Sequence, residues 1–148
     1  MSGSSVNIRL MKTHDYKKVF DLWKSTPGVG MRSLDDSEEG ISKFMKRNPN
    51  TCFIAECDNT LAGVILSGHD GRRGYIYHAV VRDEYRGKGI GRLLVQAVED
   101  SMKKEGINRL ALTAFAANEN GNRFWEHLGY STRSDILYRN KSINDNNI

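Results

Sequence analysis

The stretch Arg86-Gly87-Lys88-Gly89-Ile90-Gly91-Arg92 decides the fold, because it joins a strand pattern to the clearest helical pattern of the chain. Three glycines within five residues leave the backbone amides of this turn unshielded by side chains. The helix that follows places its partial positive charge at the same point. These residues therefore predict a turn that binds a phosphate group.

Two common glycine-rich phosphate loops do not fit this stretch. The dinucleotide-binding fingerprint requires a third glycine where the chain has Arg92. The nucleotide-triphosphatase loop requires Ser or Thr after Gly-Lys, where the chain has Gly89. The turn is therefore a phosphate site of another kind, and basic side chains stand around it at Arg86, Lys88 and Arg92.

Strand and helix patterns alternate on both sides of the turn. Strands are expected over residues 6–11, 51–57, 61–68, 75–82, 109–115 and 130–138. Helices are expected over residues 13–26, 36–48, 90–106 and 118–129. Hairpin signals in the first half predict antiparallel strands, and the strand-helix-strand order of the second half predicts one parallel crossover. The fold class is therefore α/β, with a mixed sheet flanked by helices.

Length and composition indicate one domain, residues 1–148, with disordered ends expected at 1–5 and from about 140 to 148. An apolar fraction of 39% and a charged fraction of 27% are typical of a soluble globular protein. No stretch is apolar enough to cross a bilayer and no secretory signal is visible, so we expect a cytoplasmic protein without a membrane partner. The spacing of Cys52 and Cys57 does not fit a zinc site, and no metal is expected.

The glycine-rich turn resembles the pyrophosphate-binding motif of the Gcn5-related N-acetyltransferase (GNAT) family, which reads Arg or Gln, two residues, Gly, one residue, then Gly or Ala. Arg86, Gly89 and Gly91 match this motif. Asn118 and the stretch 124–130, Phe-Trp-Glu-His-Leu-Gly-Tyr, are similar to the second motif of the family. The resemblance covers about residues 6–140. It implies a mostly antiparallel sheet of about six to seven strands, splayed between the fourth and fifth strands, with about four helices.

The resemblance also implies an activity, an N-acetyltransferase that moves an acetyl group from acetyl-CoA to a primary amine of a small molecule or a protein, by direct attack in a ternary complex. The residues implied in acetyl-CoA binding are Ala79, Val80, Val81, Arg86, Gly87, Lys88, Gly89, Ile90, Gly91, Arg92 and Asn118. Pantetheine would pair with residues 79–81 like an added strand, and the backbone N–H near Val80 or Val81 would hold the developing oxyanion. Asn118 is equally suited to cap a helix.

The motifs do not supply the groups that move protons. Trp125 stands where many members of the family have a tyrosine acid, and Thr113 stands where some have a glutamate base. His78 and Tyr77, directly before the strand that would hold pantetheine, are the predicted catalytic side chains, and His69 is the alternative imidazole. Because neighbouring residues of a strand face opposite sides, only one of Tyr77 and His78 is expected to face the acceptor.

Two other functions are compatible with the sequence. A non-catalytic sensor of acyl-CoA is one, because the usual tyrosine is missing at Trp125. A nucleic-acid-binding module is the other, with a basic face made of Arg72, Arg73, Arg82, Arg86, Lys88 and Arg92. Such a face would need aromatic residues between its charges, whereas the nearby aromatic residues fit a core, so nucleic acid is not the expected partner. The resemblance to the GNAT family implies that the acceptor amine binds near the first two helices and the loop 26–37 between them. A homodimer is compatible with the sequence pattern.

Overall fold

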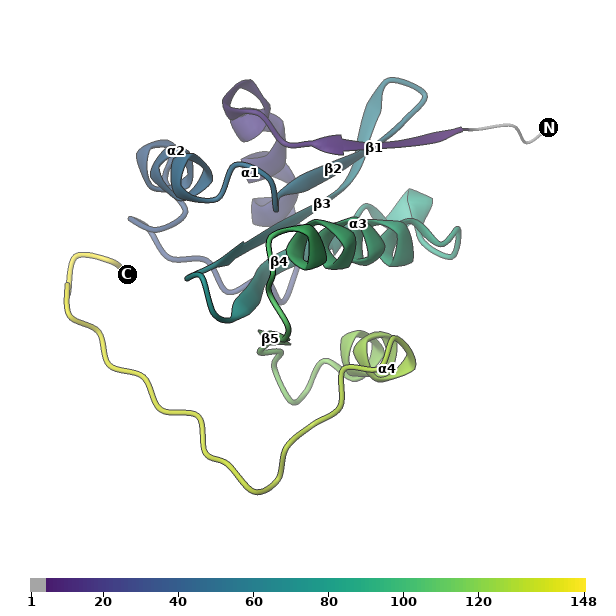
Figure 1. Ribbon diagram of the computed structural model, residues 1–148. Helices are drawn as coiled ribbons and strands as arrows, with labels where there is room; N and C mark the ends of the chain where they lie inside the picture. The colour runs from purple at the N-terminus through teal and green to yellow at the C-terminus, as the bar shows by residue number, and fades with distance from the viewer. Residues whose placement is uncertain (1–4) are drawn as a thin grey trace.

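Five strands and four α-helices alternate along residues 5–148, the part of the chain that the computed structural model describes (Figure 1). The elements are β1 (Val6–Leu10), α1 (Tyr16–Ser25), α2 (Glu38–Arg47), β2 (Phe53–Cys57), β3 (Thr60–His69), β4 (Gly74–Val81), α3 (Ile90–Lys104), β5 (Leu110–Leu112) and α4 (Glu119–His127). Two short 3₁₀ turns, η1 (Thr13–Asp15) and η2 (Asp83–Tyr85), precede α1 and α3. None of the helices in residues 5–148 is both long and apolar enough to span a membrane.

The strands form one sheet in the order β1-β2-β3-β4-β5. The first three pairings are antiparallel and the pairing of β4 with β5 is parallel, because α3 connects these two strands as a crossover. The α/β class, the mixed sheet and the four helices are confirmed. The expected number of six to seven strands is wrong, since the described chain forms five.

The missing strand is the one expected over residues 130–138. This segment leaves α4 as an extended coil and curves round toward the side of α1 and α2 (Figure 1). Its backbone bends at Ser134 and Asp135, and Arg133 donates two hydrogen bonds to the Asp135 carboxylate across this bend, at 2.8 and 2.7 Å. The segment contains apolar residues that favour a strand, but it does not pair with β5.

The sequence predicts disorder at both ends of the chain. Residues 1–4 lie outside the described part of the chain. At the other end, residues 146–148 form hydrogen bonds with the loop between α1 and α2, among them Ser33 N–H to Ile148 O at 2.7 Å and Leu34 N–H to Asn147 Oδ1 at 2.9 Å. The disorder expected from about residue 140 stays a prediction.

Two hydrophobic clusters cover the two faces of the sheet. On one face, α1 and α2 pack with side chains such as Val19, Trp23 and Ile41. On the other face, α3 packs with Ile90, Leu94, Val98 and Met102, which recur every four residues and so form one stripe of the helix. The phenylalanine and tryptophan of α4 belong to this second cluster. The sheet thus lies in the middle of three layers.

A β-bulge in β4 decides which side chains reach the site. Leu66 of β3 pairs with His78, whereas the next residue, Ser67, pairs with Ile76, so Tyr77 is an extra residue in β4. Beyond the bulge, the His78 ring contacts Trp23 of α1 and the Tyr77 ring contacts Phe44 of α2. Both side chains therefore lie on the face covered by α1 and α2. The expectation that only one of them faces this side is wrong, because the bulge breaks the strict alternation of the strand.

Candidate active site

The strands β4 and β5 pair only at their first three positions. Gly74, Tyr75 and Ile76 pair with Leu110, Ala111 and Leu112. From residue 77 to 81, the edge of β4 that faces β5 has no strand partner within residues 5–148. An unpaired edge of this kind offers N–H and C=O groups to an extended ligand.

The direction of these groups follows from the last bond of β4 to β3. Arg82 N–H donates to Ala62 O of β3 at 2.8 Å. Because successive backbone groups of a strand point to alternate sides, the N–H of Val81 points away from β3 and into the gap beside β5. Of the two N–H groups that the family resemblance implies for the oxyanion, those of Val80 and Val81, this is the one that faces the gap.

The turn before α3 keeps its backbone open. Gly87 and Gly89 both have φ of +80°, a region that residues with a side chain rarely adopt. A Cβ atom at either position would meet no atom within 4 Å. No side chain caps α3, and its first amides precede the first helical bond, from Leu93 N–H to Gly89 O at 3.1 Å. The exposed N–H groups and the open space in front of them fit a pyrophosphate.

The turn, the end of β4 and α4 meet at one point. Arg86 Nε–H donates to Val81 O at 3.1 Å and so ties the turn to the unpaired part of β4. A Cβ at Gly91 would lie 3.0 Å from the Phe124 ring of α4 and 3.8 Å from the Val81 side chain. Gly91 therefore allows α3, α4 and β4 to approach closely. The residues predicted to bind acetyl-CoA on β4 and in the turn are brought together here.

The basic residues of the turn keep their charges in solvent. Arg86 is 57% exposed and lies 3.2 Å from Asp83, and Lys88 lies over the ring of Tyr85 at 5.5 Å from its centroid. Arg92 is exposed on the first turn of α3. These charges surround the open amides and favour an anionic group at the same point. Asn118 takes the structural part of its two expected roles, because its side chain accepts the Gly121 N–H at 3.0 Å and caps α4.

The imidazole of His78 is held by a buried carboxylate. His78 Nε2 lies 2.8 Å from Asp36 Oδ1, and the two side chains are 11% and 7% exposed. The other carboxylate oxygen of Asp36 accepts the Arg32 N–H at 2.7 Å. The Trp23 ring lies edge-on to the imidazole, with 4.8 Å between centroids. No local sequence pattern predicts this contact, because the two residues are 42 positions apart.

Tyr77 lies beside His78 in a cluster of aromatic rings. Its centroid is 5.4 Å from that of Phe44 and 4.8 Å from that of Tyr75. Burial raises the pKa of Tyr77, and the nearby Tyr75 and Asp35 raise it further. The phenol therefore stays protonated at neutral pH, where it donates a hydrogen bond and cannot act as a base. The side chain is still 52% exposed.

The other imidazole expected near the site has a different place. His69 Nε2 lies 2.6 Å from Glu105 Oε1 at the end of α3, and His69 Nδ1 accepts the Gly71 N–H at 2.9 Å. Both ring nitrogens are therefore engaged, at the end of β4 where β5 still pairs. This geometry favours His78 over His69 for proton transfer.

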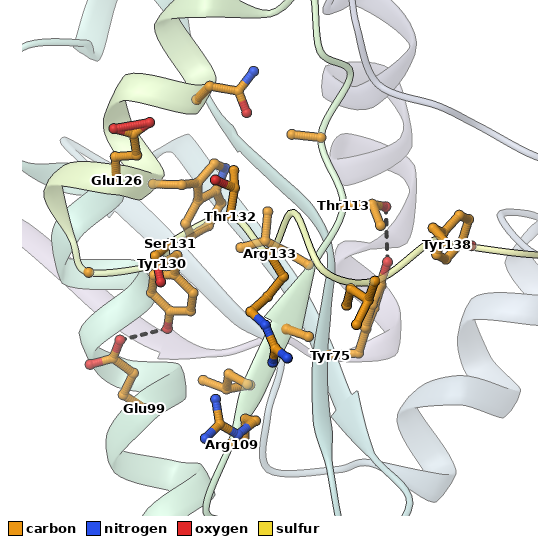
Figure 2. Close-up of a pocket in the computed structure, with 18 of the residues that line it drawn as sticks. Tyr75, Glu99, Arg109, Thr113, Glu126, Tyr130, Ser131, Thr132, Arg133 and Tyr138 are labelled. Atoms are coloured by element: carbon orange, nitrogen blue, oxygen red, sulfur yellow. Dashed lines mark hydrogen bonds between the residues drawn. The ribbon is translucent and has the colours of Figure 1, made fainter.

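A large cavity lies on the far side of β5. It has a volume of about 1230 Å³, and its wall is formed by β5, parts of α3 and α4, and the coil that follows α4. Figure 2 shows Tyr130 reaching Glu99 across this space, with Tyr75 bonded to Thr113 at its other end. Residues 86–92 are not part of the wall. The cavity is therefore the open flank of β5, beside which the expected strand 130–138 does not pair, and it is separate from the turn.

Trp125 stands in this flank of the molecule. Its ring contacts Phe124 and Tyr130 edge-on, with centroids 5.0 and 5.3 Å apart. Tyr130 O–H donates to Glu99 Oε2 at 2.6 Å, and burial together with this bond raises the pKa of Tyr130. The phenol of Tyr130 is thus committed to Glu99, and the hydroxyl of Thr113 to Tyr75.

Comparison with known proteins decides the family. The profile of the acetyltransferase (GNAT) family matches residues 16–130. The chain belongs to the GNAT family. An acetyltransferase of Yersinia pestis (strain Pestoides F) is 27% identical over 140 residues, which cover 95% of this chain and 98% of that protein. An acetyltransferase of Sodalis glossinidius (strain morsitans) is 27% identical over 138 residues, covering 93% and 96%.

A solved structure shares the fold of this GNAT protein. The PaiA N-acetyltransferase of Thermoplasma acidophilum, in complex with coenzyme A, has a TM-score of 0.75 and 24% identity, over 87% of this chain and 91% of that chain. This GNAT protein is an acetyl-CoA-dependent N-acetyltransferase, as the family and the named relatives indicate. Neither the nucleic-acid-binding module nor the non-catalytic sensor gains support from these relatives.

Proposed function

We propose that this GNAT protein transfers the acetyl group directly to a primary amine of a small molecule or a protein, with both substrates bound in a ternary complex. The observation that supports the proposal is the junction formed by residues 77–91, in which the imidazole of His78, an unpaired strand edge and an uncapped helix start follow one another. When bound, acetyl-CoA supplies the thioester carbonyl that the amine attacks. The residues of the chain bind and orient the two substrates, and they move protons.

The backbone carries most of the binding to acetyl-CoA in this proposal. The amides of residues 86–91 hold the pyrophosphate, assisted by the charges of Arg86, Lys88 and Arg92. The free edge of Ala79, Val80 and Val81 pairs with the amides of pantetheine. The Val81 N–H donates to the oxygen of the thioester carbonyl, where negative charge develops during the attack. Asn118 keeps its place at the start of α4, next to the strand gap.

His78 is the general base of the proposal. A primary alkyl amine is largely protonated at neutral pH, because its pKa is about 10.4, and only the neutral form is a nucleophile. His78 takes up the proton that the attacking neutral amine loses as its nitrogen bonds to the thioester carbon, which contributes roughly a hundredfold or more in rate. Tyr77 keeps its proton and donates a hydrogen bond on the acceptor side, next to Phe44 and Tyr75.

Calorimetric titration with acetyl-CoA, followed by a free-thiol assay on the same samples, tests the proposal. The thiol assay is run with a panel of amines that covers the acceptor classes of the family: a peptide with a free N-terminus, an aminoglycoside, a polyamine and free amino acids. We expect micromolar binding of acetyl-CoA and thiol release on one class of amine. His78→Gln, which keeps a polar side chain without a base, should lower turnover about 100-fold while acetyl-CoA affinity is kept.

Each outcome distinguishes the functions that the sequence left open. Acetyl-CoA binding without thiol release on any amine would contradict turnover and favour the sensor. Absence of acetyl-CoA binding would contradict the assignment of the turn. Thiol release on one amine class would identify the acceptor. The cytoplasmic location stays a prediction of the sequence.

A further inference from the structure

We propose that Asp36 is a positioning residue for catalysis, because its carboxylate holds His78 in the tautomer with a proton on Nε2 and leaves Nδ1 free to take the proton of the acceptor amine. The inference rests on the proposed function, in which His78 is the base. It adds a residue of the loop between α1 and α2 that neither the motifs nor the relatives assign.

The Asp36 carboxylate has little freedom to move. Oδ1 contacts His78 Nε2 at 2.8 Å and Oδ2 accepts the Arg32 N–H at 2.7 Å. The backbone of Asp36 is fixed as well, since its N–H donates to Arg32 O at 2.9 Å and its C=O accepts the Tyr16 O–H at 2.7 Å. Two hydrogen bonds thus hold the side chain, which is 7% exposed, and two more hold its backbone, so the positions of the carboxylate oxygens are fixed.

The chemistry of a carboxylate then fixes the tautomer of His78. An ionised carboxylate only accepts hydrogen bonds, so the short contact with Asp36 Oδ1 requires a proton on Nε2. In the neutral imidazole the lone pair is then on Nδ1. The edge-on Trp23 ring, at an interplanar angle of 67°, restricts rotation of the imidazole. Orientation and tautomer are therefore both set from outside β4.

The second nitrogen of the His78 ring is left without a hydrogen bond. Within the part of the chain that the structure covers, Nδ1 has no hydrogen-bond partner, whereas Nε2 has Asp36. The His78 side chain is 11% exposed, so the ring is not fully closed off from solvent. With Nε2 engaged by Asp36, Nδ1 is the ring nitrogen that can take up a proton.

The proton transfer balances without any further reactant. The amine nitrogen forms a bond to the thioester carbon, the C–S bond breaks, and its electron pair leaves on sulfur. The amine proton passes to Nδ1 of His78 and from there to the thiolate or to water. No group is oxidised or reduced. Asp36 stays ionised and acts only by holding Nε2–H and by stabilising the imidazolium that forms.

The test is the variant Asp36→Asn, because an amide has one oxygen and one NH₂ in place of two oxygens. The Arg32 N–H requires the amide oxygen, so the NH₂ faces Nε2 of His78 and donates to it. This moves the imidazole proton to Nδ1, the nitrogen that has to act as the base. We expect turnover to fall about 100-fold or more, with the KM for the amine and the acetyl-CoA affinity within about threefold of wild type.

Nitrogen NMR of ¹⁵N-histidine-labelled protein reads the tautomer directly and needs no acceptor. His78 is assigned among the four histidines by its loss in the His78→Gln variant. Wild type should show Nε2–H at His78, and Asp36→Asn should show Nδ1–H. Because the wild-type spectrum alone decides the tautomer, the inference stays testable even where the variant folds poorly. A wild-type Nδ1–H tautomer would overturn it.

A second histidine–carboxylate pair of the chain provides the matched control. His69 Nε2 contacts Glu105 Oε1 at 2.6 Å, away from the unpaired edge of β4. Glu105→Gln should change the His69 signal and leave both the His78 signal and turnover as in wild type. Turnover is measured with the amine found by the panel. Full turnover in Asp36→Asn would overturn the inference. If the wild-type protein did not bind acetyl-CoA, that result would instead contradict the proposed function.

Discussion

The first turns of α2 and α4 differ from the first turn of α3 in the groups that meet their free amides. Ser37 Oγ accepts the Gly40 N–H at 3.0 Å at the start of α2, and Asn118 Oδ1 accepts the Gly121 N–H at 3.0 Å at the start of α4. The start of α3 has Gly89 with φ of +80° and no side-chain cap. The sequence thus places serine and asparagine at the starts of α2 and α4, where side chains cap the helix, and glycine at the start of α3, where we propose that the amides bind a ligand.

Capped and open helix starts differ little in their effect on helix stability. A capping side chain stabilises a helix by about 1 kcal/mol, and glycine at the same position does nearly as well because water or a ligand reaches the amides. The start of α3 loses little stability by being open. In return, it gains a place where an anion interacts with several N–H groups and with the helix dipole. A helix start with glycines at positive φ beside an unpaired strand edge is therefore a stronger sign of function than either feature alone.

The largest effect is expected from Gly89→Val, which breaks the open start of α3. A β-branched residue at φ of +80° is strained and places methyl groups in front of the amides. We expect the affinity for acetyl-CoA to fall at least about 100-fold, which corresponds to about 2.7 kcal/mol. Calorimetric titration measures the loss.

Gly106→Val is the matched control for this substitution. Gly106 follows the other end of α3, has φ of +78°, and a Cβ there would meet no atom within 4 Å. The strain should lower the free energy of unfolding by a similar amount, about 1–3 kcal/mol, in both variants. Only Gly89→Val should lose acetyl-CoA affinity. Equal affinities in the two variants would mean that the turn does not bind the pyrophosphate.

At the start of η1, a charged carboxylate accepts the free backbone N–H. Asp15 Oδ2 accepts the Lys12 N–H at 2.8 Å, and the Arg9 guanidinium donates to both carboxylate oxygens at 2.8 Å. Burial alone would raise the pKa of Asp15, but the hydrogen bonds from Arg9 and Lys12 outweigh it, so this pKa lies below its ordinary value. Asp15→Asn should lower the free energy of unfolding by about 2 kcal/mol at pH 7.

The pH dependence of this loss has a definite sign. A carboxylate whose pKa is lowered by folding stabilises the protein above its unfolded pKa of about 3.9. That stability is lost as the pH falls through the lowered folded value. The difference between wild type and Asp15→Asn in urea unfolding should therefore be constant from pH 7 to about 5 and shrink below pH 4. A difference that grew on acidification would contradict the assigned direction.

A smaller effect is expected from Asn118→Ala. This variant tests whether the residue that caps α4 also contacts acetyl-CoA. Loss of the cap should cost about 1 kcal/mol of stability, as should Ser37→Ala at the start of α2. If Asn118 also contacts acetyl-CoA, as the family resemblance implies, only Asn118→Ala should lower the affinity, by about tenfold for one lost hydrogen bond. Thermal unfolding and calorimetry on both variants measure the two effects. Unchanged affinity would restrict Asn118 to its capping role.

The parts of this site that could be read from the sequence are local ones. The turn 86–92 and the stripe of α3 are set by residues a few positions apart, and the structure agrees with the elements expected there. The bulge at Tyr77 and the contact between His78 and Asp36 depend on how segments far apart meet. The strand expected over 130–138 failed for the same reason, because its apolar residues favour a strand only where an edge pairs with them.

The smallest effect is expected at the contact between the end of the chain and the loop before α2, which no local sequence pattern predicts. Asn147 Oδ1 accepts the N–H groups of Leu34 and Asp35 at 2.9 and 3.1 Å, and its Nδ2 donates to Asp35 Oδ2 at 2.8 Å. Asn147 thus meets two loop amides as Ser37 and Asn118 meet helix amides. The contact is exposed, so water replaces it and Asn147→Ala should cost only about 0.5 kcal/mol.

Hydrogen exchange resolves such a small change where unfolding does not. In Asn147→Ala the amides of Leu34 and Asp35 should exchange faster, because they lose their partner, while the rest of the fold keeps its rates. Asn146→Ala is the control, since Asn146 contacts Ser33 through its backbone oxygen. Faster exchange in both variants would show that the end of the chain leaves the loop as a unit. Unchanged exchange in Asn147→Ala would mean that the loop before Asp36 is held from within, by the bonds between Arg32 and Asp36.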